Sequence, residues 1–265
     1  MKTPVEIAER HTKVGGVDVL WRQAGDAPIL YLHGVPVPGW QWEPFLARCG
    51  GIAPDLPGFG RSGKPGDFDY TIDGYDRFVE EFCDHAGLER VSLVMHDWGS
   101  VGLAFAQRRP ERVERLVLSS CVPFVPGFRW HRVARIWRTG LLGELAMGFT
   151  TRRAFRRELP DALAERAYDE FDHGTQRAVL NLYRASPPEV LARHGERLGE
   201  VRCPALVEWP TRDPYVPAEF GQRMADALGG ETRLELVDAG HWPWLERPEI
   251  VDRVEEFLSS APGVY

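Results

Sequence analysis

The sequence lacks several features that would place the protein in a specialised class. No apolar stretch approaches the roughly 20 residues that a membrane-spanning helix needs, and the first residues contain no apolar segment of a secretory signal. The 39 acidic residues outnumber the 32 basic ones, so a basic face for nucleic acid is not expected. We therefore expect a cytoplasmic protein with neither nucleic acid nor a membrane as a partner.

Cysteine is also scarce. The chain of 265 residues has four, Cys49, Cys83, Cys121 and Cys203, each isolated in apolar surroundings. No paired spacing suggests a zinc site, and without an export signal disulfides are not expected. We expect buried free thiols, no metal and no cofactor, and the sequence leaves the oligomeric state open.

Predicted strands and helices alternate along most of the chain. Apolar runs at 29–32, 91–94 and 116–118 predict buried strands, and helices are predicted at 71–88 and 100–109. Such alternation implies a parallel sheet covered on both faces, that is, an α/β protein. The other predicted elements are strands at 5–11, 17–23, 51–53, 205–209 and 234–237 and helices at 218–228 and 249–258.

The alternation stops after Pro123. Residues 124–198 show helical patterns rich in Arg, Trp and Phe and no convincing strand. We expect residues 1–123 and 199–265 to form one core domain, interrupted by a helical domain over 124–198. Arginines cluster at 152–157 in that segment, but acidic neighbours favour a solvated face.

One turn between a strand and a helix carries the chemistry. In His96-Asp97-Trp98-Gly99, Asp97 stands at the carboxyl end of a strand, where open α/β sheets bind ligands. The G-x-S-x-G elbow exposes the residue at this position, and Gly99 keeps the turn uncrowded. Met95 replaces the first glycine of that pattern. Asp97 is our candidate nucleophile, although a helix cap would alone explain an aspartate here equally well.

Two further residues follow later strands in the order that a triad requires. Asp213 lies just beyond the strand at 205–209, and His241 lies just beyond the strand at 234–237. Separately, Asp213 before Pro214 is a turn former and His241 is explained as a core histidine. The order nucleophile, acid, histidine, with each residue after a strand, favours a catalytic triad instead.

The loop that begins at His33 supplies the remaining part of the predicted site. Hydrolases with a nucleophile elbow stabilise the oxyanion with two backbone N–H groups, one from such a loop and another from the residue after the nucleophile. These donors are here the backbone N–H groups of Val35 and Trp98. Pro36 has no N–H and stiffens the loop.

The stretches 31–123 and 203–258 resemble α/β-hydrolases of the branch that contains epoxide hydrolases and haloalkane dehalogenases. The resemblance implies an α/β-hydrolase fold with a mostly parallel central sheet, and the segment 124–198 looks like the inserted helical cap of that branch. It rests on four motifs: His33-Gly34-Val35-Pro36, Asp55-Leu56-Pro57-Gly58-Phe59-Gly60-Arg61-Ser62, His96-Asp97-Trp98-Gly99 and Gly240-His241-Trp242.

An aspartate at the elbow indicates a particular reaction. Its reference pKa of about 3.9 leaves it ionised at neutral pH, so it can displace a leaving group from saturated carbon and form an alkyl ester. His241, oriented by Asp213, then activates water to hydrolyse the ester. We expect hydrolysis at an alkyl carbon rather than esterase activity.

Donor residues of the predicted cap determine which leaving group the enzyme can use. An opened epoxide leaves an alkoxide that needs a proton, and Tyr183 lies in Leu180-Asn181-Leu182-Tyr183-Arg184, which resembles the segment of epoxide hydrolases that bears a ring-opening tyrosine. His131 is the candidate second donor. We therefore expect an epoxide hydrolase that converts a small apolar or aromatic epoxide and water to a vicinal diol.

Alternatives remain for the second donor and for the reaction. Tyr168 and His173 are further candidates for the second donor, and Trp130 or Trp137 would suit a haloalkane dehalogenase, because a halide needs N–H donors and no proton. Trp40, Trp42, Phe124 and Trp130 hint at an aromatic substrate pocket.

A binding module without turnover belongs to another class, and the fold alone does not exclude it. A binder has no need for the histidine and acid of a triad, so Asp213 and His241 argue against it.

Overall fold

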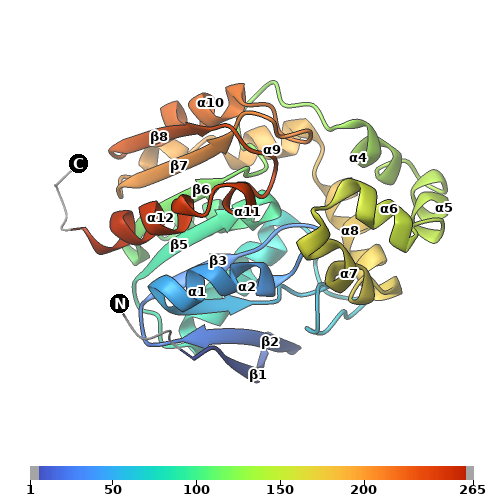
Figure 1. Cartoon of the computed structure of the whole chain (residues 1–265), viewed down its shortest axis with the longest axis horizontal. Helices are drawn as coiled ribbons and strands as arrows, with labels where there is room; N and C mark the ends of the chain where they lie inside the picture. Colours follow the sequence, from blue (N-terminus) through green and yellow to red (C-terminus); the bar gives the residue numbers. More distant parts are fainter. Residues whose placement is uncertain (1–5, 261–265) are drawn as a thin grey trace.

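A twisted sheet of eight strands organises residues 6–260, the part of the chain that the computed structural model describes (Figure 1). The strand order is β1-β2-β4-β3-β5-β6-β7-β8; β2 pairs antiparallel with β1 and β4, and the other pairs are parallel. The predicted α/β class and mostly parallel sheet are confirmed. The strands are β1 (Ala8–Val14), β2 (Val17–Ala24), β3 (Ile29–Leu32), β4 (Gly51–Pro54), β5 (Val91–His96), β6 (Val113–Ser119), β7 (Ala205–Pro210) and β8 (Thr232–Val237).

Helices lie on the sheet and beyond the carboxyl ends of its strands. Figure 1 shows α1 and α12 side by side in front of the sheet, and the group α4 to α8 to the right of it. The α-helices are α1 (Glu43–Cys49), α2 (Ile72–His85), α3 (Gly102–Arg108), α4 (Arg132–Trp137), α5 (Leu142–Gly148), α6 (Arg152–Glu158), α7 (Asp161–Asp169), α8 (His173–Ala185), α9 (Pro188–His194), α10 (Glu219–Ala227), α11 (Pro243–Glu246) and α12 (Glu249–Ser259). Short 3-10 helices are η1 (Gly39–Trp42), η2 (Asp97–Val101), η3 (Pro110–Arg112) and η4 (Leu198–Glu200).

The connections put the predicted site at the centre of the sheet. From β3 the chain passes to β4 on one side, and it then returns to place β5 on the other side of β3. Ligands of open α/β sheets bind at such a switch point, outside the carboxyl ends of the strands. β3 ends immediately before His33, and β5 ends immediately before Asp97.

The sequence predicted most strands and helices at the observed positions, but it predicted their ends less accurately. Thr71 caps α2 as predicted: its side chain accepts a hydrogen bond from the N–H of Gly74. β1 runs to Val14, past the predicted end at residue 11, because Gly15-Gly16 turns the chain directly from the pair Val14–Val17. Val5, the first residue of that predicted strand, lies outside the described residues.

The helices α4 to α8 lie between β6 and β7 in the chain, within the segment 124–198. The division into a core domain over 1–123 and 199–265 and a cap over 124–198 stays a prediction. No helix in residues 6–260 has both the length and the apolar character needed to cross a membrane.

Candidate active site

The turn after β5 holds Asp97 in a backbone conformation that few residues adopt. Its φ is +51°, in the left-handed region that is costly for a side chain and often found at functional sites. A Cβ at Gly99 would lie 2.0 Å from the carbonyl oxygen of Leu32, and one at Gly34 would lie 2.3 Å from the Asp97 carboxylate. Both glycines are therefore required for β3 and the elbow to approach each other.

The Asp97 carboxylate faces the loop after β3. The backbone N–H of Val35 donates a hydrogen bond to its Oδ2 at 2.8 Å. Burial raises the pKa of Asp97, while His241 and the N–H groups of Val35 and Trp98 act in the opposite direction. The structure thus brings both predicted oxyanion donors to this carboxylate.

His241 and Asp213 form a hydrogen-bonded pair beside it. His241 Nδ1 and Asp213 Oδ2 are 2.7 Å apart, and the side chains are 4% and 0% exposed. Asp213 Oδ1 accepts hydrogen bonds from the N–H groups of Tyr215 at 2.7 Å and Val216 at 3.1 Å. These two bonds fix the carboxylate, so its second oxygen is presented to the imidazole.

Each member of the pair stabilises the charged form of the other. Burial lowers the pKa of His241, but the carboxylates of Asp213 and Asp97 outweigh it, so the pKa lies above the usual 6.5. Burial raises the pKa of Asp213, and His241 with the two backbone donors reverses that effect to leave it below 3.8. Asp213 therefore stays ionised and orients a proton on Nδ1, which leaves Nε2 of His241 as a base.

His96 positions the loop that carries His241, a role that the sequence did not suggest. Its Nε2–H donates to the carbonyl oxygen of His241 at 2.8 Å, and the Ser120 hydroxyl donates to the same oxygen at 3.1 Å. Burial lowers the pKa of His96 well below its usual value, so the ring stays neutral. The signal was present in the run His96-Asp97, but only its second residue was assigned a function.

A cavity of about 260 Å³ separates this elbow from the helices of the 124–198 segment. Its volume is near the lower end of the range for small-molecule sites, and its walls are largely aromatic, which suits a small apolar ligand. Besides Asp97 and His241, residues that line it include Phe128, Trp130, His131, Trp137, Phe155, Tyr183 and Tyr215.

Tyr183 and His131, the two predicted cap donors, both line the cavity. The Tyr183 ring stands edge-on to Trp98, with centroids 5.1 Å apart, and the side chain is buried. Burial, with the Asp97 charge, raises the pKa of Tyr183 well above 10, so the hydroxyl keeps its proton.

His131 caps α4 through its ring. Nδ1 accepts a hydrogen bond from the N–H of Ala134 at 3.4 Å, so the neutral ring carries its proton on Nε2. Burial, aided by the charge of His241, lowers the pKa of His131 to about 4. At neutral pH the ring is therefore an uncharged donor.

The tryptophans near the elbow differ in how their N–H groups are used. Trp130 donates to the carbonyl oxygen of Ser186 at 2.9 Å. The buried Nε1 of Trp98 makes no hydrogen bond of good geometry within the described residues. Its N–H acts to lower the pKa of Tyr183, but burial of the phenol outweighs this effect. Trp98 is also absent from the described residues that line the cavity, whereas Trp137 is present.

Several predicted placements were wrong. Trp40, Trp42 and Phe124 do not line the cavity. Trp40 donates to Glu170 at 3.0 Å, and Trp42 stacks on Trp244 with centroids 5.2 Å apart. Aromatic composition marks an apolar environment, but it does not distinguish the protein core from a pocket wall.

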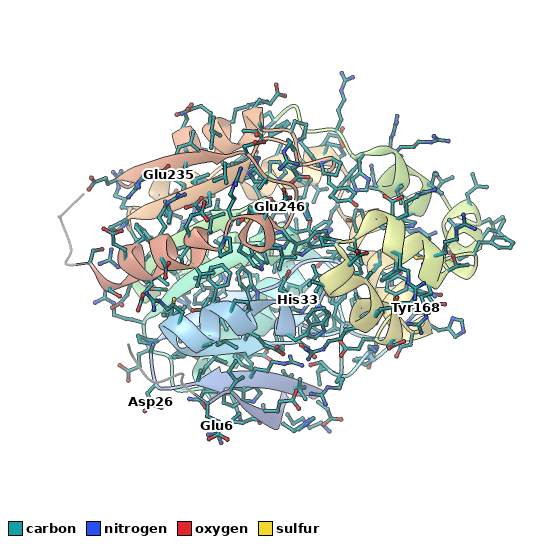
Figure 2. All side chains as sticks on the ribbon, in the orientation of Figure 1. Glu6, Asp26, His33, Tyr168, Glu235 and Glu246 are labelled. Carbon is teal, nitrogen blue, oxygen red and sulfur yellow. The ribbon has the colours of Figure 1, made fainter. Side chains whose placement is uncertain are left out.

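Tyr168 and His173, the other candidate donors, also lie away from the cavity. Tyr168 packs on Phe155, and Figure 2 labels it out on the helical group, while His33 lies near the centre of the molecule. His173 begins α8 and contacts Gln176. The spacing of residues in the sequence did not show which side of these helices faces the cavity.

Tyr215 is a second residue whose role the sequence did not suggest. Its ring lies edge-on to His241 and His131, with centroids 5.0 and 5.1 Å away. Its hydroxyl donates to the carbonyl oxygen of Glu158 at 3.2 Å, which ties the loop after β7 to the helical segment. Its place two residues after Asp213 was the available signal.

No group of three or more His, Cys, Asp or Glu side chains within residues 6–260 is arranged to hold a metal ion. The four cysteines, all of which lie in this range, form no disulfide; Cys83 and Cys121 are buried as predicted, while Cys49 and Cys203 are partly buried.

The comparisons with known proteins agree with this fold. The model of the alpha/beta hydrolase family matches residues 29–254. Haloalkane dehalogenase 2 of Mycobacterium bovis is 31% identical over 252 residues, which cover 84% of each chain. The chain belongs to the alpha/beta hydrolase family, in the branch of haloalkane dehalogenases and epoxide hydrolases.

Two other relatives are similar either over less of the chain or at lower sequence identity. A haloalkane dehalogenase of Bradyrhizobium diazoefficiens is 39% identical over 137 residues, which are 48% of this chain and only 43% of that protein. The crystal structure of epoxide hydrolase A from Mycobacterium thermoresistibile aligns with a TM-score of 0.80 over 96% of this chain and 98% of its own, at 23% identity. The latter likeness concerns the fold alone.

Proposed function

We propose that the protein is an epoxide hydrolase that forms vicinal diols through an alkyl ester on Asp97. One observation carries the proposal: Tyr183, a buried phenol that keeps its proton, lines the same cavity as Asp97. His131, an uncharged donor, lines it as well. An alkoxide leaving group requires such donors, and a halide does not.

In the first step an oxygen of the Asp97 carboxylate bonds to an epoxide carbon, and the carbon–oxygen bond of the ring breaks. The oxygen that leaves takes the proton of Tyr183, while the Nε2–H of His131 donates a hydrogen bond to it. The elevated pKa of Tyr183 makes its phenol a weak acid, but an alkoxide is a still stronger base.

In the second step His241 Nε2 takes a proton from water, and the hydroxide attacks the ester carbonyl carbon. The N–H groups of Val35 and Trp98 stabilise the negative oxygen that develops. Collapse expels the diol oxygen, which takes the proton back from His241 and leaves Asp97 as a carboxylic acid. This carboxyl gives the second proton of the water to solvent, which restores the carboxylate. A proton from solvent restores Tyr183.

Haloalkane dehalogenation is the second candidate. It is supported by the names of the sequence relatives, by the buried Trp98 N–H without a hydrogen bond of good geometry in the described residues, and by Trp137 in the cavity wall. Against it stands Trp130, whose N–H already donates to Ser186. Val35 offers no side-chain donor to a halide.

The direct test compares two products from one preparation: diol from styrene oxide and bromide from 1-bromobutane. The proposal predicts a diol rate at least tenfold above the bromide rate. Trp137→Phe should leave the diol rate within about twofold, because this residue donates to no leaving group in the proposed reaction. Faster bromide release that Trp137→Phe suppresses would instead establish the dehalogenase.

A further inference from the structure

Exposed hydrophobic side chains gather at one place on the surface. Seven large hydrophobic residues are exposed in the described part of the chain, and six of them lie between residues 133 and 149. We call these six the α4–α5 patch: Val133, Ile136, Leu141, Leu142, Leu145 and Phe149. The seventh is Leu236 on β8. Contiguous apolar surface of this kind marks an interaction site more often than a free surface.

Helical spacing places the exposed large hydrophobic residues of α5 and its C-cap on one side. Leu142 and Leu145 of α5 and Phe149, the C-cap residue, are three and four positions apart, so they share a face, while Gly143 and Met147 are buried. Leu141 and Phe149 are 80% and 79% exposed. Figure 1 shows α5 as the outermost element on its side of the molecule, and the exposure of these side chains means that the rest of the described chain does not cover this face.

Positive charge borders the patch along α4. Residues 129–138 contain four arginines and no acidic residue, in a chain whose net charge is −7. Within residues 6–260, Arg129, Arg132 and Arg135 form no ion pair. Two of the four arginines of α6 differ: Arg152 and Arg156 pair with carboxylates of α7, as expected of a solvated face.

Three of these arginines also surround a surface hollow. Arg129, Arg135 and Arg138 line it together with Trp130 and Pro188, and its volume is about 350 Å³. Guanidinium groups bind phosphate oxygens with directed, charge-assisted hydrogen bonds. An anionic membrane surface has acyl chains below and phosphates above. The apolar face suits the acyl chains, and the unpaired arginines that border it suit the phosphates.

We propose that the α4–α5 patch docks on the surface of an anionic membrane. Leu142, Leu145 and Phe149 enter the acyl boundary, and the arginines of α4 contact the phosphates. A second copy of the chain fits less well, because a two-fold interface would bring the arginines of both copies into one contact area, and residues 129–138 contain no acidic residue to pair with them. The proposal revises the sequence-based expectation of no membrane partner, and it does not depend on which reaction the site performs.

The patch also borders the active-site cavity. Val133 and Phe149 belong to the patch and line the cavity. Docking therefore sets this part of the cavity wall next to the bilayer, where apolar small molecules concentrate.

The test is sedimentation of the full chain with vesicles of phosphatidylcholine, alone or with 30% phosphatidylglycerol, at about 50 mM salt. We expect binding only to the anionic vesicles and its loss at high salt. Arg129→Gln/Arg135→Gln should weaken it about 25-fold, at about fivefold per arginine. Leu142→Gln/Leu145→Gln should weaken it at least tenfold.

Matched controls lie away from the patch. Leu236→Gln removes an equally exposed leucine, and Arg90→Gln/Arg109→Gln removes two arginines near the other end of the sheet. Both should bind like the native chain. No binding to the anionic vesicles overturns the proposal, as does equal weakening in the controls. Dimerisation that Leu142→Gln/Leu145→Gln abolishes, without vesicle binding, overturns it in favour of a second copy.

Discussion

Replacing Asp213 by asparagine should slow hydrolysis of the alkyl ester far more than its formation. Asp213 Oδ1 accepts from two backbone N–H groups, those of Tyr215 and Val216, while Oδ2 lies 2.7 Å from Nδ1 of His241. Because those N–H groups can only donate, the amide oxygen of the substituted asparagine must face them. Its NH₂ group then faces Nδ1 of His241, which has to accept, so the imidazole proton moves to Nε2. A ring protonated at Nε2 cannot take a proton from water.

The magnitude follows from the burial of the pair, whose side chains are 0% and 4% exposed. Water cannot replace the lost contact, and a buried hydrogen bond to a charged group contributes about 1.5–3 kcal/mol. The wrong tautomer adds to this, and in the serine–histidine–aspartate triad the same change lowers kcat by about 10⁴. We expect ester hydrolysis to slow by about 10³–10⁴. Alkylation should persist, because the Asp213 charge raises the pKa of Asp97 and its removal favours ionised Asp97.

The assay is intact-protein mass spectrometry after mixing with excess styrene oxide. The Asp213→Asn protein should accumulate one adduct per chain while diol release becomes slow. Asp238→Asn, at an exposed carboxylate that pairs with Arg212, is the matched control and should behave like the native chain. Native-like hydrolysis by the Asp213 variant would refute the reasoning, and so would an equal loss of both steps.

Three further predictions concern the donor, the base and the elbow. Tyr183→Phe should slow epoxide opening by about 10–150-fold, the equivalent of 1.5–3 kcal/mol for a hydrogen bond to a charged group; unchanged single-turnover alkylation would exclude that role. Because His241 must be neutral to act, single-turnover ester hydrolysis should fall with decreasing pH as His241 gains a proton; Asp213 still raises the pKa of His241 in the ester, while the raising effect of the Asp97 charge is lost, and a rate that does not fall at acid pH contradicts this. Gly99→Ala places a Cβ 2.0 Å from a backbone oxygen of β3, so urea unfolding should show a loss of about 1–3 kcal/mol or more, whereas Gly66→Ala, in open space, should lose little.

The sequence predicted the parts of the site that depend on strand ends. Asp97, Asp213 and His241 each follow a strand of one parallel sheet, and such strands end at a common edge. Apolar runs identify strands reliably, so this convergence could be anticipated.

The helical segment was less predictable because side-chain direction decides its role. Tyr183 and His131 line the cavity, whereas Tyr168 does not, and the pattern of residues on short helices did not separate them. Tyr215 escaped notice because its contacts with His131 and His241 join loops distant in the chain.

The central claim is that Asp97 itself attacks the substrate carbon, and isotope labelling of the native chain tests it most directly. One turnover in H₂¹⁸O, with enzyme in excess, should place ¹⁸O in the peptide that contains Asp97, because water attacks the ester carbonyl. The first product should carry unlabelled oxygen from the carboxylate. Label in the first product with none in the Asp97 peptide would mean direct attack by water, and it would contradict the mechanism.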